Sequence, residues 1–317
     1  MSRADVDPDA VVSGDQHALA KAITLIENKE NGWREVLSTL HTTGTDVPVV
    51  GITGSPGAGK STLVDKLVAE YRSADETVGI LAVDPTSPYS GGAILGDRIR
   101  LTDHGGDPGV FTRSLSTRGA TGGLTPAVDG VLTAFEAFGF DRIIIETVGA
   151  GQSEIDVINQ TDTVIVVLQP QSGDDIQLLK AGILEIGDIF VVNKMDLPGS
   201  QRTLQEVSAM IEELRAAHDA WKIPLIETSA ERATGIEDLH SAIEAHQSYL
   251  RDSGQFARRR CQRYDAWITS IIEHQLRERI TGLHEQSGEK STHVEAVRER
   301  KRSPHAIADI LLEQIEL

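Results

Sequence analysis

The segment Gly54-Ser55-Pro56-Gly57-Ala58-Gly59-Lys60-Ser61 constrains the fold of this chain more than any other feature. It matches the pattern G-x-x-x-x-G-K-[ST], it follows an apolar run at 49–53, and it opens a helical pattern at residue 60, which is the context the motif needs. Glycines let successive backbone N–H groups close around phosphate oxygens, and the helix N-terminus attracts negative charge. Lys60 reaches the β- and γ-phosphates, and the Ser61 hydroxyl coordinates Mg²⁺. The motif, extended by Thr62, therefore predicts a nucleoside triphosphate site.

The pattern around this motif alternates between apolar, β-branched runs and helical segments over about two hundred residues. Most of the apolar runs are continuous, as in strands that are buried on both faces. Such alternation predicts an α/β fold of the P-loop NTPase type, with a mostly parallel sheet flanked by helices. The predicted strands lie at 49–53, 78–83, 142–148, 163–168, 189–193 and 225–228, and the predicted helices at 60–73, 126–138, 178–184, 204–218 and 236–250.

Three regions are expected along the chain. Residues 1–45 hold an acidic tail, mobile over 1–14, and two short N-terminal helices broken around Asn31-Gly32. Residues 46–252 form the P-loop domain. Residues 253–317 contain no further strand pattern, and their spaced apolar residues predict a C-terminal arm of two or three amphipathic helices. Because this arm has too little apolar surface for its own core, we expect it to pack on the main domain or on a second subunit.

Composition limits the partners and the compartment. The chain carries 48 acidic against 30 basic residues, a net charge of −18, so a broad basic face for nucleic acid is not expected. The arginine run at 258–260 is predicted to form a solvated or interface face. No apolar stretch is long enough to span a membrane, no signal peptide is visible, and a single cysteine, Cys261, fits a reducing cytoplasm. Because only nine basic residues are lysine, the acidic excess fits either a salt-adapted cytoplasm or high solubility.

The tetrad Asn193-Lys194-Met195-Asp196 indicates which base is bound. It ends a predicted strand, as N-K-x-D does in P-loop GTPases. A carboxylate there accepts hydrogen bonds from the guanine N1–H and 2-amino groups, both of which adenine lacks. The asparagine is expected to tie this loop to the P-loop. Thr228-Ser229-Ala230, at the next strand end, resembles the loop that contacts the guanine 6-oxo group, so GTP and GDP are the expected ligands.

The Mg²⁺ site requires carboxylates near the strand ends. Glu146 precedes Thr147-Val148-Gly149 where most GTPases have an aspartate in D-x-x-G, and the Gly149 N–H is placed to meet the γ-phosphate. Asp84 ends the predicted strand at 78–83, and Asp97 lies in a glycine-rich loop at 90–97. These three acidic residues, with Ser61, are the candidate metal ligands.

Five segments together resemble the MeaB/ArgK family, a group of SIMIBI-class P-loop GTPases. The family is associated with chaperoning of adenosylcobalamin-dependent methylmalonyl-CoA mutase, and an older label calls its members transport-system ATPases or kinases for lysine, arginine and ornithine. The resemblance covers nearly the whole chain. Its segments are Gly54–Thr62, Val83–Arg98, Arg113–Leu124, Glu146–Glu154 and Asn193–Asp196.

The resemblance implies roles for particular residues. Asp84, Asp97 and Glu146 are expected to surround Mg²⁺ with Ser61, and residues 91–98 and 149–154 to form two switches. A third mobile segment, 171–184, is expected to present Lys180 to the nucleotide and the partner. The C-terminal arm is expected to embrace a second copy in a homodimer. The residues expected to assist hydrolysis are Lys60, Asp97, Glu146 and Lys180.

Hydrolysis by in-line attack of water on the γ-phosphate is the expected reaction. No glutamine directly follows Gly149, because Ala150 and Gly151 precede Gln152, so slow intrinsic turnover controlled by a partner is expected. Three functions stay open. They are a GTPase chaperone of a cobalamin-dependent acyl-CoA mutase, a metal-delivery GTPase, and a kinase or ATPase linked to lysine, arginine and ornithine transport. One cysteine and ten scattered histidines disfavour metal delivery, and N-K-M-D disfavours an ATP-dependent kinase.

Overall fold

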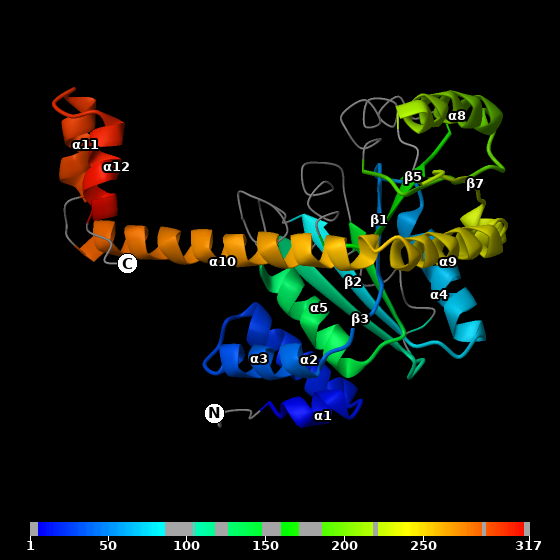
Figure 1. Ribbon diagram of the computed structural model, residues 1–317, viewed down its shortest axis with the longest axis horizontal. Coiled ribbons are helices and arrows are strands. Elements are labelled where there is room, and N and C mark those ends of the chain that lie inside the picture. Colours follow the sequence, from blue (N-terminus) through cyan, green and yellow to red (C-terminus); the bar gives the residue numbers. More distant parts are fainter. Residues whose placement is uncertain are drawn as a thin grey trace. The chain divides into compact units, whose positions relative to one another are not determined.

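A seven-stranded parallel sheet forms the centre of the protein, seen in the computed structural model in Figure 1. The structure describes residues 6–85, 104, 106–117, 126–147, 160–170, 186–217, 221–286 and 290–313. The strand order is β3-β2-β4-β1-β5-β6-β7, so β1, which leads into the P-loop, lies in the middle. The strands are β1 (Val49–Gly54), β2 (Val78–Pro85), β3 (Val110–Thr117), β4 (Arg142–Thr147), β5 (Thr163–Leu168), β6 (Ile189–Val192) and β7 (Leu225–Glu227).

Helices cover both faces of the sheet because successive strand residues point to opposite sides. On β1, Val49 packs with α5 (Pro126–Phe138), whereas Val50 and Ile52 pack with α4 (Lys60–Ser73) and α9 (Ile236–Asp252). Helix α8 (Ser200–Ala217) packs against one face of β5 and β6. The predicted parallel α/β architecture is confirmed.

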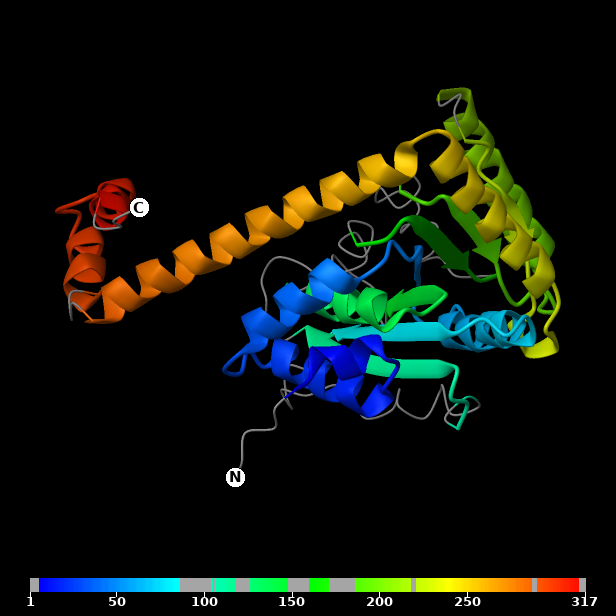
Figure 2. The same ribbon diagram turned by 60° about the horizontal axis from the view of Figure 1, so that its bottom comes forward.

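The N-terminal helices form a further layer outside α5, as Figure 2 shows. They are α1 (Pro8–Val12), α2 (Gln16–Glu27) and α3 (Trp33–Thr43), and the break between the last two falls at Asn31-Gly32, as predicted. The expectation that residues 1–14 form a mobile tail is wrong for the described part of that range. Asp7 caps α1, with its carboxylate accepting from the Asp9 N–H at 3.0 Å, and Val11 is fully buried in the core.

Strand β3 was not expected from the sequence. Its residues, VFTRSLST, include only three apolar side chains, Val110, Phe111 and Leu115, so this strand at the end of the sheet lacks the continuous apolar run of the inner strands. By contrast, the predicted bounds of α4, α5 and β5 are reproduced to the residue. The predicted helix at 178–184 lies outside the described residues.

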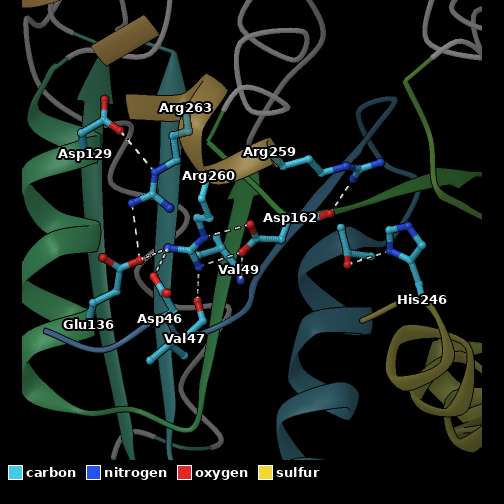
Figure 3. Close-up of polar contacts among 11 residues, drawn as sticks. Asp46, Val47, Val49, Asp129, Glu136, Asp162, His246, Arg259, Arg260 and Arg263 are labelled. Carbon is cyan, nitrogen blue, oxygen red and sulfur yellow. Dashed lines mark hydrogen bonds and ion pairs between the residues drawn. The ribbon is translucent and has the colours of Figure 1, made fainter. Parts of the chain in front are cut away.

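A buried charge network closes the amino-terminal edge of the sheet (Figure 3). Arg260 donates to Asp162 at 2.9 and 2.8 Å, to Glu136 at 2.5 Å and to the Val47 carbonyl. Arg259 binds Asp188 through two hydrogen bonds of 2.8 Å each. The network joins strand starts, α5 and the first turns of α10 (Gln255–Gln286).

The expectation of a solvated or interface face at 258–260 is therefore wrong for Arg260, which is only 4% exposed. Burial lowers the pKa of Arg260, but the charges of Asp162 and Glu136 outweigh that effect and raise it overall. Only Arg258 of the run is exposed. A run of like charges gives no sign of distant buried partners, and the partners here lie about 100 residues or more away in sequence.

The chain divides into two compact units, Met1–Arg263 and Tyr264–Leu317. The second unit contains the rest of α10 together with α11 (Lys290–Arg298) and α12 (Pro304–Glu313). Several of its apolar side chains are exposed, including Ile268, Ile272 and Leu312. Within the described part of the chain, no helix is both long and apolar enough to span a membrane.

Candidate functional site

The P-loop lies between the end of β1 and the start of α4. Gly54 has φ 139°, and a Cβ there would meet the Val167 carbonyl oxygen at 2.0 Å, so only glycine lets β1 pass β5 at this point. Lys60 is 6% exposed, and its ammonium donates to the carbonyls of Gly54 and, at 3.1 Å, of Ser55. Its charge is thus held against the inside of the loop, at the position the phosphate motif requires.

Ser55 adds a polar group to this loop. Its hydroxyl oxygen is buried and has no hydrogen-bond partner among the described residues. Buried polar groups are nearly always paired, so an unpaired hydroxyl in a phosphate-binding loop fits a site that is completed by ligand oxygens.

Ser61 and Glu146 meet beside the P-loop. The Ser61 hydroxyl donates to Glu146 Oε1 at 2.5 Å, and Glu146 is 2% exposed near the end of β4. The two residues come close because β1 and β4 are neighbours: Ile52 of β1 pairs with Glu146 of β4, and the P-loop that carries Ser61 follows directly on β1. A hydroxyl and a carboxylate are hard oxygen donors of the kind Mg²⁺ prefers.

The base loop is tied to the P-loop by Asn193, as the sequence predicts. The Asn193 amide donates to the Ala58 carbonyl at 2.8 Å, and its Oδ1 accepts from the Thr228 hydroxyl at 3.0 Å and the Ala230 N–H at 3.1 Å. Gly59, with φ 89°, provides the necessary close approach, because a Cβ there would meet Asn193 Nδ2 at 2.5 Å. One buried amide therefore holds three loops together.

A pocket of about 150 Å³ opens between these loops. Asp196 lies in it, and its Oδ1 accepts from the Ser229 hydroxyl at 2.6 Å. This hydrogen bond lowers the pKa of Asp196, and the charge of Arg232, at 3.9 Å, acts in the same direction. The carboxylate is therefore an oriented acceptor. The pocket is lined by Gly59, Thr62, Asn193, Lys194, Asp196, Leu197, Ser229, Ala230 and Glu231.

Several predicted site residues lie outside the described part of the chain: Asp97, Gly149 and Lys180. Asp84 is the last residue but one of β2, two residues beyond Ala82, which pairs with Glu146 of β4, but the side chain of Asp84 also falls outside the described part. Their predicted roles stay predictions. The predicted site residues that the structure does describe lie together at the carboxyl ends of the strands: the P-loop, Glu146, the base tetrad and residues 228–230.

Gln169 is part of this site, although the sequence did not single it out. It directly follows β5, and its side chain contacts both Lys194 and the Pro56 carbonyl. The available signal was its position, since a polar residue that ends the strand beside β1 must lie at the carboxyl edge of the sheet.

The chain is similar to known proteins over most of its length. The family model described as "Methylmalonyl Co-A mutase-associated GTPase MeaB" matches residues 19–285. A Pyrococcus horikoshii protein named "Putative GTPase PH0274" is 41% identical over 95% of each chain, and the Mus musculus "Methylmalonic aciduria type A homolog, mitochondrial" is 31% identical over 84% of this chain and 71% of that one.

Among solved structures, one titled "Crystal structure of LAO/AO transport system kinase" matches 99% of this chain and 98% of its own, with a TM-score of 0.73 and 24% identity, and it shows the shared fold. The family model and the Pyrococcus relative are both named as GTPases, which agrees with the phosphate loop and the base pocket. The chain belongs to the MeaB family of methylmalonyl-CoA mutase-associated GTPases and is itself a GTPase.

Proposed function

We propose that this protein is a Mg²⁺-dependent GTPase that acts as a chaperone and gatekeeper for an adenosylcobalamin-dependent acyl-CoA mutase, with methylmalonyl-CoA mutase as the first candidate. The observation that carries the proposal is the meeting of a phosphate loop, a Ser61–Glu146 oxygen pair and a pocket with Asp196 at one sheet edge. The family description supports the choice of partner.

The residues of the site suit GTP hydrolysis. The Lys60 ammonium, now against the Gly54 and Ser55 carbonyls, would turn to the β- and γ-phosphates, a short movement of a flexible stem. Ser61 and Glu146 would hold Mg²⁺, with Asp84 and Asp97 as further proposed ligands. The metal would neutralise charge on the phosphate oxygens. Asp196 would accept from the guanine N1–H and 2-amino groups.

Slow turnover fits a checkpoint. In the sequence no glutamine directly follows Gly149, so a water-orienting group is not supplied in the usual place. A partner that orders the switches at 91–98 and 149–154, and Lys180 in 171–184, would then set the rate. In this way the γ-phosphate would report its presence to a bound mutase.

We further propose that the protein acts as a homodimer in the cytoplasm, with no nucleic-acid or membrane partner. Ile268 and Ile272 lie one helical turn apart on α10, and both are more than half exposed within their unit. Such a pair is costly to leave in water, and a second copy of the chain would cover it.

Capture from extract of the source cells tests the partner. The tagged protein, loaded with a non-hydrolysable GTP analogue or with GDP, is used as bait, and a Lys60→Ala variant serves as the nucleotide-free control. Recovery of a cobalamin-dependent mutase in a nucleotide-dependent amount is expected. Failure to recover such a mutase in any nucleotide state would contradict the proposed partner.

A further inference from the structure

Gln169 bridges two loops of the nucleotide site. Its Oε1 accepts a hydrogen bond from the Lys194 ammonium at 2.9 Å, and its Nε2 donates to the Pro56 carbonyl at 3.4 Å. The residue follows directly on β5, which pairs with β1 on one side and with β6 on the other. The P-loop and the base loop follow those two neighbouring strands, so Gln169 stands between them.

Lys194 is the residue that depends on this bridge. It lines the base pocket and has φ 59°, a left-handed conformation that non-glycine residues adopt only when their surroundings enforce it. Its ammonium donates to the Gly57 carbonyl at 2.5 Å and to Gln169 Oε1. Both acceptors are neutral oxygens, one from the P-loop backbone and the other from Gln169.

These contacts fix the direction of a long side chain. A lysine stem has several rotatable bonds and loses considerable rotamer entropy when it is held in one place. Two hydrogen bonds at its far end stretch the stem between the base loop and the P-loop, along one wall of the pocket. Without Gln169, one backbone carbonyl would be left to hold the ammonium, and the wall would be free to move.

We propose that Gln169 is a positioning residue for guanine nucleotides, acting through Lys194 rather than by touching phosphate or water. The inference rests on the proposed placement of the base in the Asp196 pocket. It assigns Gln169 to base binding, which GTP and GDP share, and not to the hydrolysis step. It also separates Gln169 from base selection, which depends on Asp196.

The test measures equilibrium dissociation constants for GDP, a non-hydrolysable GTP analogue and the corresponding inosine analogue, with kcat and KM for GTP. In Gln169→Leu, the dissociation constants for GDP and the GTP analogue should rise together by roughly 10-fold, since one hydrogen bond to a charged group is lost. The kcat should stay within about twofold and the preference for guanine over inosine should be unchanged, because neither depends on the Lys194 contact.

Two further variants isolate the contact. Gln169→Glu keeps an oxygen acceptor for Lys194 and should recover most of the affinity that Gln169→Leu loses. In a Lys194→Met background, which keeps an apolar stem without the ammonium, Gln169→Leu should change the dissociation constants less than about twofold. Gln205→Leu, at an exposed position on α8, is the matched control for loss of a glutamine, and thermal melting of each nucleotide-free variant verifies folding.

Three results would overturn the inference: unchanged dissociation constants in Gln169→Leu, full additivity with Lys194→Met, or a fall in kcat with binding intact. If the wild-type protein does not prefer guanine over adenine nucleotides, the proposed base site itself fails. If that preference holds and Gln169→Leu has no effect on it or on affinity, only the role of Gln169 fails.

Discussion

Replacing Arg260 with methionine tests the buried network at the amino-terminal edge of the sheet. Methionine fills much of the arginine volume, so the main loss is charge and hydrogen bonding. Arg260 donates hydrogen bonds to Asp162, to Glu136 and to the Val47 carbonyl. The carboxylates of Asp162 and Glu136 are only 3% and 7% exposed. Removing one partner of a buried ion pair leaves the other charge uncompensated, which lowers the free energy of unfolding by about 3–5 kcal/mol.

That loss is a large fraction of a typical total of about 5–15 kcal/mol. The assay is urea unfolding of the full chain at pH 7.5, followed by far-UV circular dichroism. Arg258→Met is a matched control from the same arginine run, because Arg258 is exposed, and it should stay within about 0.5 kcal/mol of wild type. A difference of less than about 1 kcal/mol between the two variants would refute the assignment of Arg260 to the fold.

Three further predictions concern the base pocket, the buried carboxyl of α5 and the P-loop. Asp196→Asn should weaken GTP binding by roughly 100-fold and favour xanthosine triphosphate, because the 2-oxo group of xanthine can accept a hydrogen bond from the new amide. Competition binding measures the selectivity between the two nucleotides, and unchanged selectivity would contradict the role of Asp196. Burial raises the pKa of Asp129 to about 7. Between about pH 4 and pH 7 the folded protein therefore keeps a proton on Asp129 that the unfolded protein has released, so the free energy of unfolding falls as the pH rises through this range. The free energy of unfolding of Asp129→Asn, measured with urea and compared with that of wild type, should therefore rise by roughly 2–3 kcal/mol from pH 5 to pH 8. A difference in unfolding free energy that does not change with pH would exclude a raised pKa of Asp129. Gly59→Ala, whose Cβ would meet Asn193 Nδ2 at 2.5 Å, should weaken GDP binding more than 10-fold, and wild-type affinity would show that the loops separate freely.

The inner fold and the phosphate site were predictable because their signals are local. Buried parallel strands have continuous apolar runs, and the P-loop motif fixes where β1 ends and α4 begins. Glu146 was predictable as a partner of Ser61, because the carboxyl ends of neighbouring parallel strands meet at one edge.

The remaining features depend on contacts between distant residues. Strand β3 lies at the end of the sheet and contains only three apolar residues, so no strand signal is present in the sequence there. Helix α1 is too short for periodicity to reveal, and it is held by burial of Val11. Arg260 lies in an arginine run and Gln169 directly follows a strand, but neither pattern reveals the partner that gives the residue its role, Asp162 and Lys194 respectively.

Turnover of GTP with and without the candidate partner tests the central claim most directly. Release of free phosphate from GTP and from ATP is measured for the isolated protein, and then with an adenosylcobalamin-dependent methylmalonyl-CoA mutase from the same source. Slow hydrolysis of GTP, little of ATP, and a change of several-fold in the GTP rate on adding the mutase are expected. A GTP rate that the mutase leaves unchanged, or transfer of the γ-phosphate from ATP to an acceptor, would contradict the account.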